Sequence, residues 1–463
     1  MRPARTCLAL SLWLVSSWIL NATLYAGFDS VMPEARDIAS AFAVVVALLA
    51  TFAAVHRPDM FKERLFTPLC YGILLCGIAL SLLGIGLKLP VLIVAGSAVR
   101  ASSSIWFLLL VGLSLSTLSA RSASVVVAGA YVLKYAWWFV SSMLAFEVLV
   151  AVYALIPLAI VLLVRRFTLP AFSEIADLGS RLVHQVTSPQ SFLPFTHVLF
   201  ITIVVFQAAA GYALAFGSQA GVPADSAYSF APLLVVLLLA LRKRRLPADW
   251  LFAAAAILVI AGFFFVEEVT FAPGMPRIPW ANVLLNAGAD CFEILIWFVL
   301  AQIVRRNVME ALPVLFFFSA ATHLGIEIGA TLGHATNALG WSFPAYVTLA
   351  RLGIALMFIS YIIVVLKPFS FEATIEQVAP MNKPLVSLPA RTLEENCEQV
   401  AAAYSLTPRE SEVLGLLARG RNAQAIQEKL VVSRNTVKSH VKNVYNKLGV
   451  HSQQELIDLV ESR

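Results

Sequence analysis

The sequence predicts an all-α protein in which a bundle of transmembrane helices precedes a small domain of four helices. Three observations predict this fold. The 463 residues are 60% hydrophobic and 13% charged, whereas soluble domains are about 45–50% apolar and about 25% charged. Apolar runs near the length that crosses a bilayer as a helix recur to about residue 366. Beyond Lys367 the composition turns polar.

Twelve apolar runs are predicted to cross the membrane as helices, which bond every backbone polar group internally. The first follows Arg2 and Arg5 and could pass for a signal peptide. Its length and the lack of a convincing cleavage site favour a first transmembrane helix. The predicted spans are 7–27, 35–55, 66–87, 92–119, 122–145, 147–164, 196–217, 228–241, 249–268, 281–304, 311–333 and 343–366.

Basic residues gather in alternate connections, which by the positive-inside rule face the cytoplasm. The other connections hold little beyond Lys88 and Arg277. This asymmetry predicts a multi-pass protein of the inner (cytoplasmic) membrane with both termini in the cytoplasm. The basic residues concerned are Arg2, Arg5, Arg57, Lys62, Arg64, Arg121, Arg165, Arg166, Arg181, Arg242, Lys243, Arg244, Arg245, Arg305 and Arg306.

The spans divide into two groups of six around the long connection 165–195, and basic clusters recur at 57–64 and 242–245. This arrangement resembles the six-plus-six plan of major facilitator transporters. That family's loop signature of Gly, Asp and paired Arg is absent from HRPDMFKER and LRKRRLPAD. The resemblance is therefore one of architecture, and the missing signature counts against transport.

The chain is predicted to divide into a membrane sensor domain (1–366), a linker (367–391) and a C-terminal domain (392–463). Four prolines interrupt the linker, so it cannot be helical throughout. They are Pro368, Pro380, Pro384 and Pro389.

The C-terminal segment carries the strongest local signals in the chain. Thr407 and Glu410 flank Pro408 as a capping box with proline at the first helical position. The predicted helix ends at Gly420, and a second short helix covers 422–430. Ser433 is predicted to cap a third helix, which stops at Gly449, and Ser452 to cap a fourth.

The third helix has two faces. Its apolar stripe consists of Val437, Val441, Val444 and Leu448, and its opposite side carries Lys438, Ser439, Lys442 and Asn443. Between Lys429 and Lys447 there are five basic residues and no acidic one. Short helices joined by tight turns, with a cationic third one, predict a helix-turn-helix that binds double-stranded DNA. The alternative is a protein-interaction domain with a solvated basic face.

Segment 406–460 resembles the LuxR-type helix-turn-helix domain. One departure is Ala425-Ile426-Gln427, where relatives usually show Glu-Ile-Ala; the apolar anchor is kept. The family pattern is carried by Leu406, Thr407, Arg409, Glu410, Glu412, Val413, Leu414, Gly420, Ser433, Thr436, Val437, Lys438, His440, Lys447 and Leu448.

The resemblance implies specific roles for residues of the third helix. Lys438, Ser439 and Lys442 would reach base edges, and Arg434 and Thr436 would bind the phosphate backbone. We predict that Asn443 and Lys447 complete the DNA-binding set. The resemblance also implies a homodimer through the last helix, here by Leu456, Leu459 and Val460.

Ionisable residues inside spans are costly and point to function. One hypothesis is a polar cavity between the two groups of six spans, which binds a small polar or aromatic ligand. The other is that the charged groups pair with each other and lock the two groups of spans together. The candidate ligand-binding residues are Arg100, Lys134, Trp138, Asp290, Glu293, Trp297 and Glu327.

A metal site is not predicted, although His323, Glu327 and His334 follow each other at helical spacing. Such spacing arises on any helix with several polar residues. No cofactor is predicted either, and no enzyme is expected, because the chain lacks a nucleophile elbow, a phosphate loop and an HExxH motif.

The combination resembles the membrane-bound LuxR regulators of actinobacteria, whose membrane half is thought to sense a small molecule. The sequence therefore predicts a membrane-anchored one-component transcriptional regulator. Two alternatives stay open: a transporter-like protein with secondary regulatory DNA binding, and a membrane scaffold whose tail binds protein.

Overall fold

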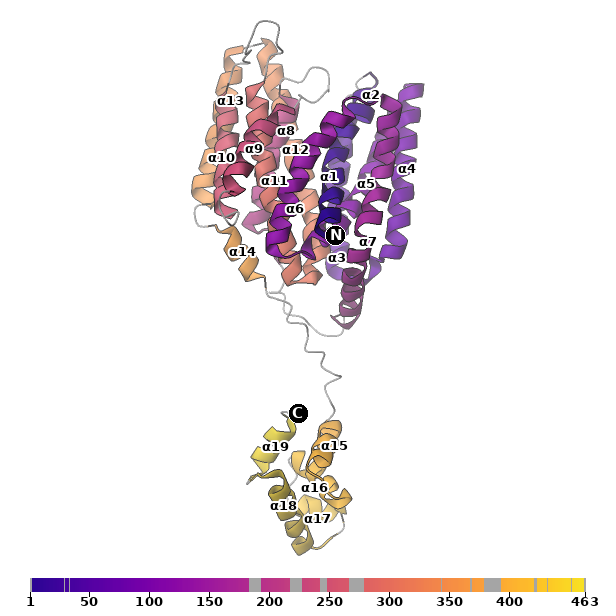
Figure 1. The fold of residues 1–463 in the computed structure, drawn as a ribbon, viewed down its shortest axis with the longest axis vertical. Coiled ribbons are helices and arrows are strands. Elements are labelled where there is room, and N and C mark those ends of the chain that lie inside the picture. Colours follow the sequence, from indigo (N-terminus) through magenta and orange to yellow (C-terminus); the bar gives the residue numbers. More distant parts are fainter. Residues whose placement is uncertain are drawn as a thin grey trace. The chain divides into compact units, whose positions relative to one another are not determined.

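The computed structural model describes residues 2–28, 30–32, 34–182, 193–216, 227–241, 248–265, 279–342, 344–366, 369–378, 393–419, 423–430, 432–450 and 452–461. Within these ranges all regular structure is helical. The chain forms two compact units, Met1–Pro380 and Met381–Arg463, which are described separately. We call them the membrane unit and the C-terminal unit (Figure 1).

The membrane unit is a bundle of helices that follow one another along the chain. They are α1 (Arg2–Leu20), η1 (Asn21–Tyr25), α2 (Ala26–Phe28), α3 (Ala35–His56), η2 (Pro58–Met60), α4 (Glu63–Leu87), α5 (Pro90–Ser116), α6 (Ala120–Ser141), α7 (Phe146–Leu182), α8 (Val198–Ala215), η4 (Ala227–Ser229), α9 (Phe230–Leu241), α10 (Ala248–Phe264), α11 (Trp280–Arg306), η5 (Val308–Glu310), α12 (Ala311–Ser342), α13 (Pro344–Tyr361), η6 (Ile362–Leu366) and α14 (Phe371–Gln377).

A helix occupies the position of each of the twelve predicted spans. In the described ranges, ten helical segments are long and apolar enough to cross a membrane. The other two positions hold shorter helices, since α9 has 12 residues and α10 has 17. A helix rises about 1.5 Å per residue and the hydrocarbon core is about 30 Å thick, so α9 as described is too short for a full span and α10 is at the lower limit of spanning length. Residues 242–247, which follow α9, lie outside the described ranges.

Helix α7 is longer than the predicted span 147–164, because it continues to Leu182 through Pro157 and Pro170. The prediction concerned the apolar run and not the end of the helix, and the two differ for a physical reason. Arg165 and Arg166 end the apolar run, but charged residues are good helix formers and do not end a helix. The arginines thus limit the part of α7 that suits lipid, while the helix itself extends beyond it.

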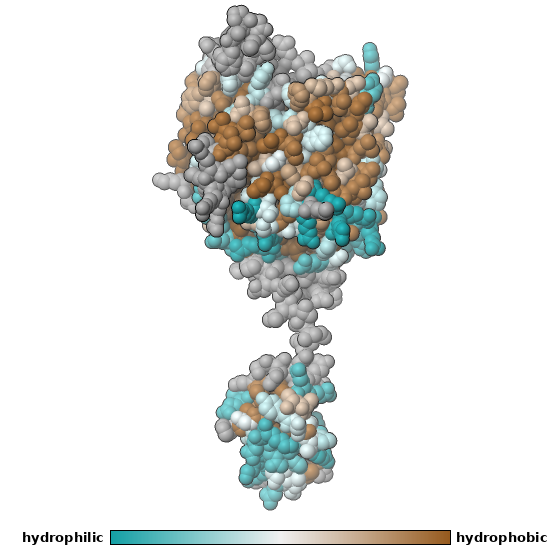
Figure 2. Space-filling view, viewed as in Figure 1, coloured by the Kyte–Doolittle hydropathy of each residue, from teal (hydrophilic) through white to brown (hydrophobic). Residues whose placement is uncertain are grey.

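The outer surface of the membrane unit is apolar. Figure 2 shows hydrophobic residues around its middle and hydrophilic ones gathered near the end where α1 begins. Large side chains such as Leu49, Val91 and Val364 are 64%, 78% and 74% exposed. A soluble protein rarely leaves so large a contiguous apolar surface uncovered. The surface fits a multi-pass membrane protein.

Helices α8 and α12 approach each other closely along a row of glycines. Gly325, Gly329 and Gly333 recur every fourth residue on α12, and Gly211 lies opposite on α8. A Cβ atom on Gly325 would lie 2.5 Å from the carbonyl oxygen of Val204, and one on Gly329 would collide with the carbonyl group of Ala208. Small residues at this spacing are the usual means by which membrane helices pack with their backbones in contact.

The chain leaves the membrane unit at the end where it enters. In Figure 1 the N-terminus and α14 lie at the same end of the bundle. α14 is capped by Ser370, whose Oγ accepts from Ala373 N at 3.3 Å, and it packs on α10 and α11. It falls within the predicted linker 367–391, and the two compact units separate after Pro380.

The C-terminal unit consists of α15 (Leu393–Ala403), α16 (Pro408–Ala418), α17 (Ala423–Leu430), α18 (Arg434–Leu448) and α19 (Gln453–Glu461). The predicted capping box is present, with Thr407 N donating to Glu410 Oε2 at 2.8 Å and Glu410 N donating to Thr407 Oγ1 at 3.4 Å. α16 ends at Ala418, and the predicted stop at Gly420 lies outside the described residues. Val413, Leu414 and Ile426 are fully buried in a core shared by all five helices.

Candidate functional site

Helix α18 is held in place by its caps and its apolar face. Ser433 Oγ accepts from Thr436 N at 3.1 Å, and Gly449 ends the helix with φ +70°, a left-handed conformation that suits glycine. Val437 and Val444 are 0% exposed and contact the core beneath α16. The predicted cap, stripe and stop of the third helix are therefore confirmed.

The face opposite this stripe is open to solvent. Lys438, Ser439, Lys442 and Asn443 are all exposed, as is Thr436 in the first turn. Ser439 Oγ donates to Asn435 O at 3.1 Å, which leaves its oxygen able to accept. The four residues lie on one side of the helix, so a single groove of duplex DNA could contact them together. The side chain of Arg434 lies outside the described residues.

Lys447 is arranged differently from the other predicted DNA-binding residues. Its Nζ donates to Glu410 Oε2 at 2.7 Å and to Ser405 O at 3.2 Å. Hydrogen bonds from Lys447 and from the Thr407 backbone lower the pKa of the Glu410 carboxyl to about 2. Lys447 thus ties the end of α18 to the start of α16, and its charge is engaged inside the domain.

The predicted dimer surface is wrong for two of its three residues. Leu456 and Val460, on α19, are 0% exposed and belong to the core of their own domain. Leu459 is partly buried against the same core. The apolar stripe of α19 packs inward because a domain this small needs all five of its helices to enclose a core. Leu456 and Val460 are therefore not available for the dimer contact that the sequence predicted.

Comparison with known families agrees with this geometry. Residues 404–460 match the family described as bacterial regulatory proteins, luxR family. These residues form a LuxR-type helix-turn-helix domain.

Curated relatives match a short part of the chain. An uncharacterised response regulatory protein of Escherichia coli, YgeK, is 46% identical over 66 residues, which are 13% of this chain and 45% of that protein. The Fimbriae Z protein of Salmonella typhimurium is 44% identical over 12% of this chain and 27% of its own length. The probable transcriptional regulatory protein SgaR of Hyphomicrobium methylovorum is 47% identical over 12% and 26%. The chain thus spans less than half of each of these relatives.

Among solved structures, the fucose:proton symporter FucP of Escherichia coli aligns with 81% of this chain and 98% of its own. The identity is 16% and the TM-score is 0.43.

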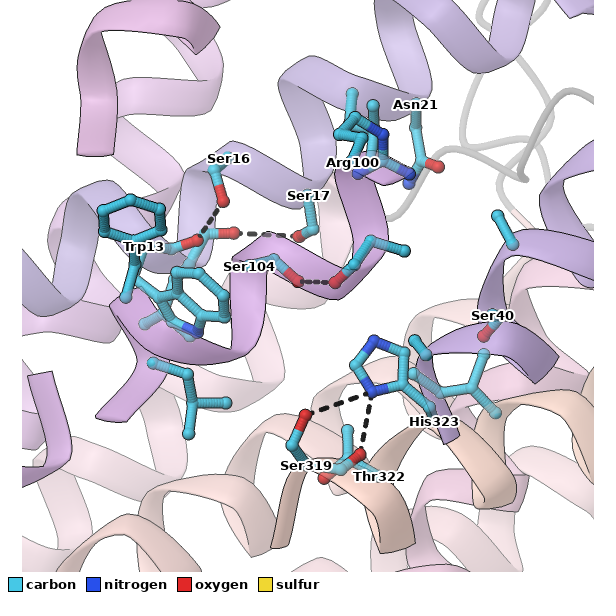
Figure 3. Close-up of a pocket in the computed structure, with 18 of the residues that line it drawn as sticks. Trp13, Ser16, Ser17, Asn21, Ser40, Arg100, Ser104, Ser319, Thr322 and His323 are labelled. Atoms are coloured by element: carbon cyan, nitrogen blue, oxygen red, sulfur yellow. Dashed lines mark hydrogen bonds between the residues drawn. The ribbon is translucent and has the colours of Figure 1, made fainter. Parts of the chain in front are cut away.

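A second candidate site is a cavity of about 310 Å³ inside the membrane unit (Figure 3). Its walls come from both groups of predicted spans, which we call the first half (α1–α7) and the second half (α8–α13). The first half contributes residues of α1, η1, α3, α4, α5, α6 and α7, and the second half contributes residues of α8, α11 and α12. The cavity therefore lies between the halves.

Five of the seven predicted ligand-binding residues line this cavity, namely Arg100, Lys134, Glu293, Trp297 and Glu327. The other two do not. Asp290 instead pairs with Lys134, whose Nζ lies 2.8 Å from Oδ1. Trp138 packs on Trp18, with ring centroids 6.1 Å apart. Of the two tryptophans expected to stack against a ligand, Trp297 alone lines the cavity.

The intramembrane charges are arranged in two ways. The Lys134–Asp290 pair joins α6 of the first half to α11 of the second, and Tyr135 Oη donates to Asp290 Oδ2 at 2.8 Å. This is the expected lock. Arg100 behaves otherwise: its guanidinium donates to the hydroxyl of Tyr153 at 3.0 Å and to that of Tyr25 at 2.8 Å.

Sequence reasoning missed the contribution of the first helix to the cavity. The helix widens to a π-helix at Asn21–Tyr25, and this turn directs Asn21 and Tyr25 toward the cavity. π-Helical turns of this kind often mark functional sites. No pattern of residue types signals such a turn. Trp13 and Tyr153 were missed because an aromatic residue in an apolar run resembles any lipid-facing or core residue.

The three residues considered for a metal site are arranged along α12. His323 Nδ1 donates to the backbone oxygen of Ser319 at 2.8 Å, so this nitrogen carries a proton. Glu327 lies on the cavity wall close to Ser40. Among the described residues, no group of three or more His, Cys, Asp or Glu is arranged to hold a metal ion.

Proposed function

We propose that this protein is a membrane-anchored one-component transcriptional regulator. It binds promoter DNA with the exposed face of α18 and senses a small molecule in the cavity between the halves. The observation that carries the proposal is the presence, in one chain, of a LuxR-type domain and of ten membrane-length helical segments in the described ranges. The LuxR-type domain lies in the cytoplasm, and both termini face that side of the inner membrane.

The face of α18 suits the major groove, which admits one α-helix. Lys438, Ser439 and Lys442 read base edges, Asn443 extends this face, and Thr436 and Arg434 bind phosphates at the start of the helix. Lys447 stabilises the domain through Glu410 and contributes least to the DNA contact. We further propose the boundaries 1–366 for the membrane sensor domain, 367–391 for the linker and 392–463 for the DNA-binding domain.

The DNA-binding part is tested with full-length protein in lipid nanodiscs and a labelled duplex from the region upstream of its own gene. Lys438→Ala and Lys442→Ala are each expected to weaken binding by about 1–3 kcal/mol, the usual value of a specific base contact. Measured by fluorescence anisotropy, the double variant should lose the preference for this duplex over an unrelated one.

Arg409→Ala is the matched control. Arg409 is an exposed cation of the same domain, and its Nη1 pairs with Glu412 on α16. Its removal should leave DNA affinity nearly unchanged. Normal promoter binding by the Lys438→Ala/Lys442→Ala variant would show that α18 is not the reading helix.

Sensing requires that the ligand bind one arrangement of the halves better than another, since only a difference in affinity can shift their equilibrium. The cavity is suited to this because its walls come from both halves. Changes at Arg100 are expected to alter the transcriptional response to the ligand without altering DNA binding in its absence. A reporter under the regulated promoter measures the first, and anisotropy measures the second.

A further inference from the structure

We infer that the cavity between the halves binds a small organic acid whose single carboxylate is held by Arg100. The inference rests on the proposed sensing function and names the class of ligand for it.

The Arg100 guanidinium is buried without a counter-ion. The residue is 4% exposed, and its two hydrogen-bond partners are the neutral hydroxyls of Tyr25 and Tyr153. Its Nε is buried and has no hydrogen-bond partner. The two tyrosines and His323 interact electrostatically with it in the described structure, and no carboxylate is among these groups. A buried cation is costly unless an anion accompanies it, so the site is incomplete without one.

The other cations on the cavity wall already have acidic partners. Lys134 pairs with Asp290 at 2.8 Å, and Arg36 Nε lies 3.3 Å from Asp37 Oδ1. Arg100 thus differs from both in the described part of the unit. A guanidinium has five N–H donors in a planar fork, of which the tyrosines occupy two. The free donors suit the two oxygens of a carboxylate.

Residues near Arg100 extend this polar corner of the cavity. His323 on α12 is close enough to Arg100 to interact with it electrostatically. Because Nδ1 of His323 donates to Ser319 O, its Nε2 is left for a polar group of the ligand. In Figure 3 Arg100 and His323 flank the same space. An anion at Arg100 therefore has a second polar neighbour from the other half.

The remaining walls restrict the rest of the ligand. Aromatic side chains of both halves line the cavity, among them Trp13, Phe107 and Trp297. The volume of about 310 Å³ is at the small end of ligand pockets, which span about 300–1,000 Å³. Glu293 and Glu327 also line the cavity, and neither offers a positive charge to a second carboxylate. The ligand is accordingly a monocarboxylate with a ring-sized apolar body.

The test uses three probes with one ring and different charges: benzoate, benzamide and benzylammonium. Each is titrated into full-length protein in nanodiscs, and binding is followed by isothermal calorimetry. Benzoate is expected to bind at least about tenfold more tightly than the other two, the effect of one charge-assisted contact. Equal affinities, tighter binding of a neutral or cationic probe, or failure of benzoate to bind would each overturn the inference.

Two variants locate the carboxylate. Arg100→Gln is expected to abolish the preference for benzoate over benzamide, whereas Arg36→Gln, the matched control with an acidic partner, keeps it. Should Arg100→Gln fail to fold, Tyr153→Phe is used. It removes one competitor for the guanidinium and should raise the ratio of benzoate to benzamide affinity. An equal loss of preference in both arginine variants contradicts binding of the carboxylate to Arg100. An unchanged ratio of benzoate to benzamide affinity in Tyr153→Phe contradicts it as well.

DNA binding is measured in the same preparations, so the two proposals can fail separately. A benzoate preference without DNA binding would refute the regulatory function and keep the carboxylate site. DNA binding without any benzoate preference would refute the carboxylate site alone.

Discussion

The ammonium of Lys134 lies 2.8 Å from Oδ1 and 3.0 Å from Oδ2 of Asp290, and the two residues come from opposite halves of the membrane unit. Both side chains are only 10% exposed. Lys134 also lies 4.9 Å from the centre of the Trp18 ring, on the first helix. The pair therefore holds α1, α6 and α11 together at the wall of the cavity.

Removing one partner of this pair should destabilise the membrane unit. Asp290→Asn leaves the Lys134 ammonium buried without an anion, and the expected loss is about 3–5 kcal/mol. Thermal unfolding in nanodiscs measures it. The double variant Lys134→Met/Asp290→Leu removes both charges and should recover most of the stability. A double variant as unstable as Asp290→Asn would show that the unpaired Lys134 ammonium is not the cause of the lost stability.

The positions of the membrane helices could be predicted because apolar length is a local property of the sequence. Helix ends could not be predicted in the same way. α7 passes Arg165 and Arg166 and reaches Leu182. Where a helix leaves lipid for water its exposed side chains become polar, but its backbone hydrogen bonds can continue unchanged.

The candidate sites could be predicted only where helical spacing places residues on the same face of one helix. Asp290 and Glu293 stand on one face of α11, as their spacing predicts, and Glu293 lines the cavity. The partner of Asp290 lies 156 residues away along the chain, and periodicity holds no information on such pairs. For Leu456, the stripe on α19 predicts an apolar contact but cannot say whether the domain's own core or a second copy provides it.

The C-terminal unit should lose stability in acid through Glu410. Its pKa falls from an ordinary 4.5 to about 2 in the folded protein. The unfolded carboxyl therefore binds a proton more readily than the folded one. The stabilisation is complete above pH 4.5 and disappears as the pH falls from 4.5 through about 2. Thermal unfolding of fragment 381–463, whose core consists of its own residues, followed by circular dichroism against pH, tests this.

Glu410→Gln is the control for the acid effect. It removes the titrating group and the ion pair with Lys447, so the variant should be less stable at neutral pH and should change less between pH 4.5 and 2. A variant with the same acid profile as the unaltered fragment would assign the effect to other carboxyls.

The glycine row on α12 should tolerate no side chain where it meets α8. In Gly329→Ala the new methyl group meets the carbonyl group of Ala208 and approaches Tyr212 N to 2.7 Å. Backbone atoms cannot turn away, so a loss of about 1–3 kcal/mol is expected. Gly353→Ala on α13 is the control, because nothing lies within 4 Å of its Cβ position. Thermal unfolding in nanodiscs should separate the two, and equal melting temperatures would contradict the close approach of the helices.

Leu456 should behave as a core residue of the C-terminal unit and not as part of a dimer surface. Leu456→Ala opens a cavity in a side-chain position that is 0% exposed, and such changes cost about 2–5 kcal/mol. Urea unfolding of fragment 381–463 measures the loss, and Gln454→Ala, on the exposed side of α19, should cost far less. If Leu456 were instead a contact between copies, its loss would lower the association of the fragment in sedimentation and leave monomer stability unchanged.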